Sequence, residues 1–232
     1  VLSFSTSFIG FTNADNVEKQ KKPLIIIPGI CGSELFAAET QRYDNFIYKK
    51  GYCFWPPQSV IPFIDEEEKA TLDDISTLSL KQITNDLKFI ICNEDGSSKV
   101  SIMPSNPILD CRNNPDNRNF GTADCYKKLV NFLKQNTDQD EYQIIFFSYD
   151  WRQSNAKTAL ELEKFINKYD FKDITFLTHS MGGLVCASYL TKQENRDKVD
   201  KSICLGAPFL GSPKAFGAID DGKFFDGIVG AV

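Results

Sequence analysis

One serine in this chain stands where it could act as a nucleophile. Ser180 lies in the stretch Thr178-His-Ser-Met-Gly-Gly183, between the apolar residues 174–177 and 184–190. The first apolar segment is typical of a buried strand, and the second of a buried helix. A sharp turn between them would lift the Ser180 oxygen clear of the strand. The backbone amide of Met181, at the positive start of a helix, could then donate to an oxyanion.

A strand, a serine in a tight turn, small residues and a helix form the pattern of the nucleophile elbow of the α/β-hydrolases. In such an elbow Gly182 lets the helix approach the strand closely. One position departs from the motif, because Thr178 stands where the elbow has a glycine two residues before the serine. The alternative is a serine that merely begins a helix after a strand. We favour the catalytic interpretation.

A glycine-containing loop is the second candidate element. Pro28-Gly-Ile-Cys-Gly-Ser33 follows the continuous apolar run 24–27, which predicts a fully buried strand. Its two glycines allow the backbone to approach a substrate. In the α/β-hydrolase fold, the loop after the corresponding strand supplies the other oxyanion donor. A plain glycine turn is the alternative, but the presence of the Ser180 motif favours the oxyanion role.

The elements that must position these residues follow a regular alternation. A helix that begins near Thr122 or Asp124 is predicted from an apolar face at i, i+3, i+4 and i+7, namely Tyr126, Leu129, Val130 and Leu133. Strand 143–147, helix 155–169, the strand and helix around Ser180, and strand 202–205 complete the prediction. Strands and helices in alternation predict an α/β fold, a mostly parallel sheet with helices on both faces.

Residues from about 40 to 120 are less regular. Phe46-Ile-Tyr48, Tyr52-Cys-Phe-Trp-Pro-Pro57 and Val60-Ile-Pro-Phe-Ile64 mix aromatic residues with prolines, and show neither helical nor strand period. The prolines exclude long regular elements. A strand is predicted only at 99–103, and residues 105–118 are rich in turn formers.

Composition excludes several classes of protein. The formal net charge of −5 over 232 residues argues against a nucleic-acid partner. No stretch reaches the 18 or so apolar residues of a spanning helix. The cysteines are too scattered for a metal site, with no C-x-x-C pair, and no cofactor is expected. Their positions are 31, 53, 92, 111, 125, 186 and 204.

The cysteines and the N-terminus bear on the cellular compartment. We expect Cys186 and Cys204 to be buried free thiols, and positions 31, 53, 92 and 111 to be the better disulfide candidates if the protein is exported. Residues 1–11 followed by Thr12-Asn-Ala14 resemble the apolar region and cleavage site of a signal peptide. We therefore interpret residues 1–21 as a signal-peptide remnant, or alternatively as an N-terminal arm. The first interpretation implies the secretory pathway, with an extracellular or lysosome-like destination.

Four motifs in order resemble the lecithin:cholesterol acyltransferase family, which includes lysosomal phospholipases and phospholipid:sterol or phospholipid:diacylglycerol acyltransferases. The motifs are Pro23-Leu-Ile-Ile-Ile-Pro-Gly-Ile-Cys-Gly-Ser-Glu-Leu35, Tyr149-Asp-Trp-Arg152, His179-Ser-Met-Gly-Gly183 and Leu205-Gly-Ala-Pro-Phe-Leu-Gly-Ser212. The second and fourth discriminate this family from other hydrolases. The resemblance covers residues 22–212, thinly between 40 and 120.

The resemblance implies Ser180 as nucleophile and the backbone amides of Ile30 and Met181 as oxyanion donors. It also implies a phospholipid substrate, water or a sterol, diacylglycerol or other alcohol as acyl acceptor, and a peripheral membrane or lipoprotein surface. Residues 43–64 resemble the family's membrane-contacting segment, within a possible membrane-contacting or lid insertion at about 40–120. Exposed aromatic residues suit an interface, but the same side chains could fill core.

The chain lacks an evident base for Ser180. Its one histidine, His179, is the immediate neighbour of the serine, and adjacent residues entering a tight turn point in different directions. We expect His179 to pack or hydrogen-bond beneath the turn. Asp150 precedes the nucleophile, whereas the acid of this fold follows it, so we expect Asp150 and Arg152 to pair and fix a loop. Residues 22–232 are therefore interpreted as the N-terminal part of one α/β-hydrolase domain, with the triad Asp and His expected after residue 232.

The leading hypothesis is a serine-dependent acyl-ester hydrolase or O-acyltransferase acting on glycerophospholipids. One alternative is a catalytically inactive lipid-binding or scaffolding homologue. The other is a lipid hydrolase like the GPI-inositol deacylases, which share a His-Ser-Met-Gly-Gly elbow.

Overall fold

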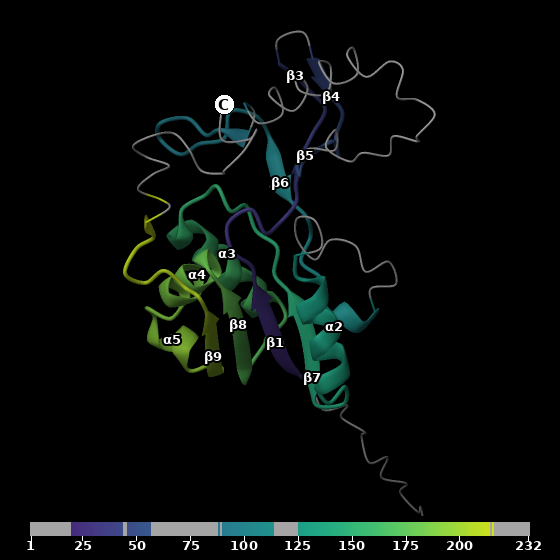
Figure 1. The fold of residues 1–232 in the computed structure, drawn as a ribbon, viewed down its shortest axis with the longest axis vertical. Helices are drawn as coiled ribbons and strands as arrows, with labels where there is room; N and C mark the ends of the chain where they lie inside the picture. The colour runs from purple at the N-terminus through teal and green to yellow at the C-terminus, as the bar shows by residue number, and fades with distance from the viewer. Residues whose placement is uncertain are drawn as a thin grey trace, which may run out of the picture.

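A computed structural model describes residues 20–43, 46–56, 88, 90–113, 125–213 and 215 (Figure 1). Residues 1–19 of the predicted signal-peptide remnant at 1–21, and residues 44, 45 and 57–64 of the predicted membrane-contacting segment, lie outside this description. The described part is built around a parallel sheet, with a small antiparallel sheet above the carboxyl ends of its strands.

The described part of the central sheet contains four parallel strands. They are β1 (Lys22–Ile27), β7 (Tyr142–Phe146), β8 (Ile174–His179) and β9 (Val199–Leu205), arranged in the order β7-β1-β8-β9. Strand β1 pairs with β7 on one side and β8 on the other. Its residues 24–27 are all buried, which explains the continuous apolar run.

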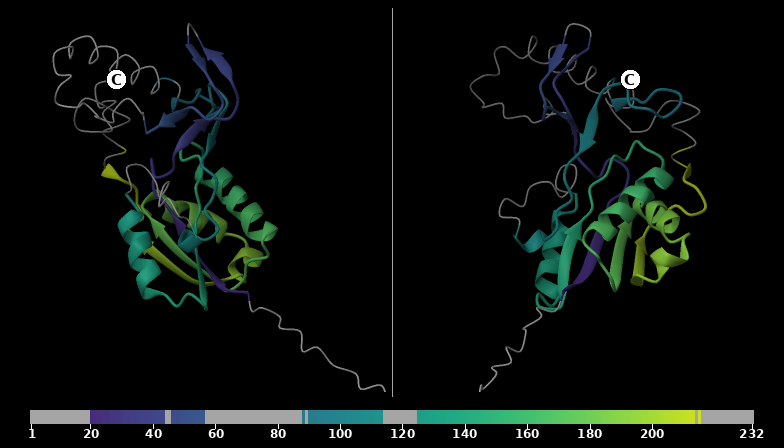
Figure 2. Two further views of the ribbon diagram at one scale, coloured as in Figure 1. Left: turned by 90° about the vertical axis from the view of Figure 1, so that its right-hand side faces the viewer. Right: turned by 180° about the vertical axis from the view of Figure 1, so that it is seen from behind.

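Helices cover both faces of this sheet, as predicted (Figure 2). Side chains alternate across a strand, so Ile25 and Ile27 face one core and Leu24 and Ile26 face the other. The first core is closed by α3 (Asn155–Lys168) and α4 (Met181–Tyr189). The second is closed by α2 (Lys127–Asn136), through Val130 and Leu133. A short helix, α5 (Gln193–Arg196), precedes β9.

The predicted alternation is confirmed, with shifts at the ends of elements. The helix predicted at 155–169 spans 155–168, and its N-cap Ser154 accepts a hydrogen bond from the Lys157 amide. The helix predicted to begin near Thr122 or Asp124 begins at Lys127, with Tyr126 at its N-cap. The last strand is longer than predicted, from 199 rather than 202.

The described part of residues 35–104 contains five short strands, and the sequence pattern predicted only one of them, at 99–103. The strands β5 (Cys53–Trp55), β2 (Leu35–Ala37) and β6 (Ile102–Pro104) form an antiparallel sheet, and β3 (Gln41–Tyr43) pairs with β4 (Phe46–Tyr48). Each has three residues, too few for a periodic pattern to be recognised. Strand β6 lies one to three residues later than the strand predicted at 99–103. Farther along, η3 (Cys111–Asn113) forms a single 3₁₀ turn.

The small sheet has its own apolar core. Tyr48 and Phe54 are buried there, with 2% and 0% of their surface exposed, whereas the neighbouring Ile47 is well exposed. For these described aromatic residues of the 43–64 segment, the core-filling alternative is therefore correct. Burial explains why aromatic residues are frequent in a stretch interrupted by prolines.

The seven cysteines, all among the described residues, form no disulfide in this structure, and this includes the four candidates. Cys186 on α4 is buried, as expected. Cys204 is exposed, contrary to expectation, because β9 lies at the edge of the sheet and no described element covers it. An apolar sequence run alone does not distinguish an edge strand from a central one.

Candidate active site

Ser180 occupies the turn between β8 and α4, in a backbone conformation that non-glycine residues rarely adopt. Its φ is 51° and its ψ is −125°. Such a conformation costs about 1–3 kcal/mol and persists only where the surroundings enforce it. Here the Ser180 amide donates to the carbonyl of Leu205 at 2.9 Å, and its carbonyl accepts from the Gly183 amide at 3.0 Å. The strained turn is thus held at both sides, by strand β9 and by helix α4.

The structure also explains why Thr178 is tolerated where an elbow has glycine. Thr178 is fully buried, and its hydroxyl oxygen would stand 3.4 Å from a Cβ atom on Gly183. The same Cβ atom on Gly183 would stand 2.4 Å from the Cβ atom of Ala207. Because Gly183 has no side chain, the threonine and Ala207 both fit against the start of α4.

The Pro28–Gly29 peptide unit is held by two buried tyrosine hydroxyls. Tyr149 Oη donates to the carbonyl of Pro28 at 2.8 Å, and the Gly29 amide donates to Tyr126 Oη, also at 2.8 Å. Both the C=O and the N–H of this peptide therefore have fixed partners. Rotation of the peptide plane would break two buried hydrogen bonds.

The next peptide unit leaves one donor free. The carbonyl of Gly29 accepts from the Gly32 amide at 3.0 Å. In a trans peptide the N–H points opposite to the C=O, so the Ile30 N–H is directed away from this turn. Within the described part of the chain it has no hydrogen-bond acceptor. The same holds for the N–H of Met181, the first residue of α4, which has no intrahelical acceptor.

Two indole rings hold the outer part of the loop. Trp55 Nε1 donates to the carbonyl of Cys31, and Trp151 Nε1 donates to the carbonyl of Ser33, both at 3.0 Å. The two rings meet edge to face, with centroids 5.5 Å apart. The loop after β1 is therefore anchored both to the small sheet, through Trp55, and to the segment after β7, through Trp151.

The loop and the turn meet at Gly29 and Ser180. A Cβ atom on Gly29 would stand 2.9 Å from Ser180 Cβ and 3.2 Å from His179 Nδ1. This contact brings the segments that carry the Ile30 and Met181 amides to the same place as the Ser180 side chain. All three predicted site residues therefore gather at the carboxyl ends of β1 and β8.

His179 makes the hydrogen bond expected of a structural residue. Its Nδ1 lies 2.8 Å from Tyr126 Oη, and the two rings meet edge to face. Its place differs from the prediction, because the ring is exposed in the wall of a pocket rather than packed beneath the turn. Among the described residues, no side chain is hydrogen-bonded to the Ser180 hydroxyl as a base would be.

Asp150 and Arg152 form the predicted pair. Arg152 Nε donates to Asp150 Oδ1 at 2.8 Å and the guanidinium NH2 donates to Oδ2 at 2.6 Å. Only 4% of the Arg152 side chain and 12% of the Asp150 side chain are exposed. A further guanidinium nitrogen donates to the carbonyl of Ile90. The pair thus fixes the segment after β7, and it is not part of the Ser180 turn.

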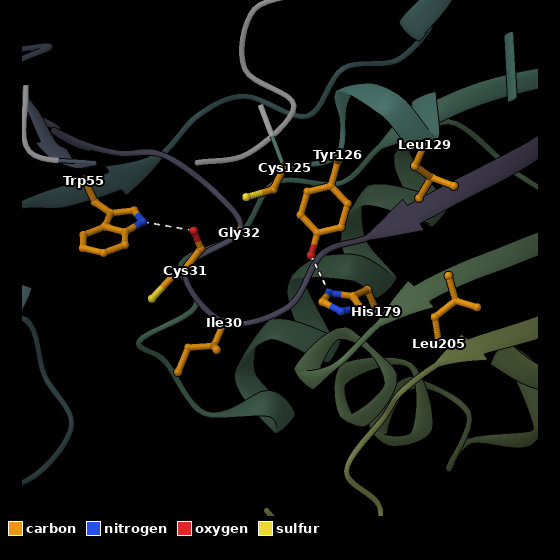
Figure 3. Close-up of a pocket in the computed structure, with 9 residues that line it drawn as sticks. All are labelled: Ile30, Cys31, Gly32, Trp55, Cys125, Tyr126, Leu129, His179 and Leu205. Carbon is orange, nitrogen blue, oxygen red and sulfur yellow. Dashed lines mark hydrogen bonds between the residues drawn. The ribbon is translucent and has the colours of Figure 1, made fainter. Parts of the chain in front are cut away.

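A pocket of about 520 Å³ opens beside the loop (Figure 3). Its lining is mostly apolar and comes from five regions of the chain: Ile30, Cys31, Gly32, Trp55, Cys125, Tyr126, Leu129, His179 and Leu205. The Tyr126 hydroxyl and His179 form its polar centre, and Ile30 points from the loop on one side. Burial raises the pKa of the Tyr126 hydroxyl and raises that of the Cys31 thiol to about 12, so both groups are neutral at pH 7.

Metal ligands and membrane-spanning helices are the remaining features of the described residues that bear on function. The described residues contain no group of three or more His, Cys, Asp or Glu side chains able to hold a metal ion. In the same part of the chain, no helix has the length and apolar character needed to cross a bilayer.

Sequence reasoning missed the roles of Tyr126, Tyr149 and Trp55. Tyr126 was recognised only as part of a helix face, and Tyr149 only as part of a motif. Their hydroxyls bond to backbone atoms about 100 residues away in sequence, and no local pattern encodes such a partner. The one available signal was the clustering of tyrosine and tryptophan, which seek a polar partner when buried.

Comparisons with known proteins agree with the motifs. The model of the lecithin:cholesterol acyltransferase family matches residues 118–230. A curated relative, phospholipase A(1) LCAT3 from Arabidopsis thaliana, is 35% identical over 83 residues, which cover 32% of this chain and 18% of the relative. These matches confirm the resemblance to this family that the motifs predicted.

The fold has a counterpart among solved structures. A chain in the crystal structure of the Tle4–Tli4 complex superposes with a TM-score of 0.52 at 18% sequence identity. The match covers 90% of this chain and 50% of the other, and at this identity it bears on the fold alone. This chain therefore spans about half the length of that structure, and under a fifth of the curated relative.

Proposed function

From the match of residues 118–230 to the lecithin:cholesterol acyltransferase family, we propose that this chain carries the nucleophile of a serine-dependent lipid acyl-ester hydrolase or O-acyltransferase. The observation that carries the proposal is the conformation of Ser180, with φ at 51° in the turn between β8 and α4. A strained serine at the carboxyl end of a central parallel strand is the arrangement of a nucleophile elbow. The proposed catalytic residue is Ser180, and the proposed oxyanion donors are the amides of Ile30 and Met181.

The proposed reaction is acyl transfer through a covalent intermediate. Ser180 Oγ attacks the ester carbonyl carbon and loses its proton to a general base from outside the described residues. The carbonyl oxygen becomes an oxyanion that accepts hydrogen bonds from the Ile30 and Met181 amides. The C–O bond to the alcohol breaks, the alcohol leaves with the proton, and the acyl group stays on Ser180. Water or a second alcohol then attacks the acyl-enzyme and restores the serine.

The free amides support the oxyanion role. Backbone donors that already have acceptors cannot bind an oxyanion without losing a bond, whereas the Ile30 and Met181 amides have none among the described residues. The Ile30 amide is also pre-oriented, because its peptide carbonyl is held by Gly32. Donors fixed before the reaction need no reorganisation when the charge develops, and each is worth about 10²–10³ in rate.

The proposed substrate is a glycerophospholipid at a membrane or lipoprotein surface. The apolar lining of the pocket suits an acyl chain, and the relative named phospholipase A(1) favours a phospholipid ester. The proposed acceptor is water, a sterol, diacylglycerol or another alcohol. A secretory, extracellular or lysosome-like location forms part of the same proposal.

A second candidate function is lipid binding without catalysis. It is favoured by one observation, that no described residue is placed as a base for Ser180. The two functions differ in what they require of the Ser180 hydroxyl. Only an enzyme needs it, since binding of an acyl chain in the apolar pocket does not involve a nucleophile.

The experiment compares the full-length protein with its Ser180→Ala variant on phosphatidylcholine vesicles that carry a labelled acyl chain. Release or transfer of the label by the wild type, and its loss in Ser180→Ala, is the expected result. Ser188→Ala, on the same helix, is the matched control and should retain activity. A fluorophosphonate probe should add its mass to the peptide that contains Ser180. Equal vesicle binding by both proteins with no acyl release by either would support the second candidate instead.

A further inference from the structure

The Tyr126 hydroxyl is shared by the two segments that carry the proposed oxyanion donors. It accepts a hydrogen bond from the Gly29 amide of the loop and lies 2.8 Å from Nδ1 of His179, the residue before Ser180 (Figure 3). A tyrosine hydroxyl has one proton. Because Gly29 is the donor in the first contact, the hydroxyl proton is available for the second. In the tautomer that carries the imidazole proton on Nε2, Tyr126 then donates to His179 Nδ1.

From these contacts the geometry points to Tyr126 and His179 as a pair of positioning residues, which align the Ile30 amide with Ser180. This inference rests on the proposed function. Neither residue needs to touch the reacting atoms. Tyr126 acts through the Gly29 amide, because the orientation of the Pro28–Gly29 peptide sets that of the Gly29–Ile30 peptide. His179 acts through the peptide bond that joins it to Ser180.

The surroundings make this link rigid. Tyr126 is 8% exposed and stands at the N-cap of α2, with its ring edge to face against Phe146 of the central sheet. Its hydroxyl therefore cannot move away from Gly29 without displacing a core side chain. Burial also raises the pKa of Tyr126, which keeps the hydroxyl protonated and able to donate.

The carbonyl side of the Pro28–Gly29 peptide shows why the hydrogen bonds of Tyr126 matter. Tyr149 holds the carbonyl of Pro28, but among the described residues its hydroxyl makes no hydrogen bond to the turn that carries Ser180. Without Tyr126, one of the two bonds that fix the Pro28–Gly29 plane is lost. The side-chain contact that joins the loop after β1 to the Ser180 turn, through the Tyr126 hydroxyl, is lost as well. The Ile30 amide should then sample directions away from the oxyanion.

The test is a double-mutant cycle on the full-length protein. Tyr126→Phe keeps the ring and removes the hydroxyl, and His179→Ala removes the acceptor. We expect each to lower kcat by about tenfold to a hundredfold, less than complete loss of an oxyanion donor, with KM within about threefold. The double variant should be no slower than the slower single variant, because both changes break one link.

Two further variants distinguish a positioning role from a general loss of core packing. His179→Asn places an amide oxygen near the Nδ1 position and should recover most of the rate that His179→Ala loses. Tyr142→Phe is the matched control. Tyr142 packs against the same core as Tyr126, and its hydroxyl has no hydrogen bond within the described residues, so kcat should not change.

The outcomes distinguish this inference from the proposed function. If Ser180→Ala abolishes activity while Tyr126→Phe keeps wild-type kcat, the enzyme stands and the positioning link is wrong. Additive losses in the double variant would also overturn the link, as would equal losses in His179→Asn and His179→Ala. If Ser180→Ala keeps its activity, the proposed function itself has failed.

Discussion

Gly182 packs directly against the carbonyl oxygen of Ile27. A Cβ atom at Gly182 would stand 2.3 Å from that oxygen and 2.6 Å from the carbonyl oxygen of Pro28. Both neighbours are backbone atoms, one at the last residue of β1 and one at the residue after it, so they cannot turn aside as a flexible side chain would. This contact sets how closely the first turn of α4 approaches the end of β1, and hence the spacing between Ser180 and the loop.

Replacing Gly182 with alanine should therefore separate the two segments. We expect Gly182→Ala to lower the free energy of unfolding by about 1–3 kcal/mol, as overpacking does, and to reduce acyl transfer more strongly than stability. Chemical denaturation and activity assays check both effects. Ala187→Ser, at an exposed position of the same helix, is the control. Wild-type stability and activity in Gly182→Ala would show that the contact is looser than described.

The strain at Ser180 predicts opposite effects on activity and stability. Glycine adopts a φ of 51° without steric cost, so Ser180→Gly should be as stable as the wild type or more stable, by up to about 1 kcal/mol. Ser180→Ala keeps the strain and should be the less stable of the two. Both should lose acyl transfer. Thermal melting of the pair measures the difference, and a lower melting temperature for Ser180→Gly would argue against strain at this position.

The pair formed by Asp150 and Arg152 should be a major contributor to stability. Asp150→Asn leaves a buried guanidinium with 4% exposure without its counter-charge, which costs about 3–5 kcal/mol in comparable pairs. The exposed pair of Lys172 and Asp170 serves as the comparison. Lys172→Gln should change the free energy of unfolding by less than about 1 kcal/mol. Equal effects in the two variants, measured by denaturation, would contradict the assignment of Asp150 and Arg152 as a buried structural pair.

The buried thiols predict loss of stability at alkaline pH. Burial raises the pKa of Cys111 to about 12 and that of Cys186 to about 11, from an ordinary value of 9.0. The folded-state pKa is the higher one, so the stabilising effect is full below pH 9. It is lost as the pH rises through 9 towards 11 and 12, because the unfolded chain ionises first.

Denaturation at a series of pH values between 8 and 11 checks this prediction. The free energy of unfolding should fall with pH, and the slope should be smaller in Cys186→Ala than in the wild type. The exposed Cys204 provides the control, since Cys204→Ala should leave the slope unchanged. A slope that is the same in all three proteins would mean that Cys186 is accessible to water in the folded state.

The sequence was sufficient where structure is local. Three segments carry a local signal in their own residues, and each formed the predicted element. They are the apolar run at 24–27, the helical spacing at 155–168 and the apolar run before Ser180. The Asp150 and Arg152 pair was also predictable, because two residues of opposite charge stand two positions apart at the end of a strand. The strands β2 and β5 were not, because each has three residues and pairs with partners distant along the chain.

The sequence by itself was enough to predict the chemistry that we propose for this protein. A serine between a β-prone run and a helix, followed by two glycines, needs no distant partner to be recognised. Only the tertiary structure decided how that serine is held. The hydroxyls of Tyr126 and Tyr149 bond to a loop about 100 residues earlier, and Thr178 fits because Gly183 lies against it. Such contacts depend on how whole helices and strands pack together, and the hydrophobic pattern of a single segment does not predict that packing.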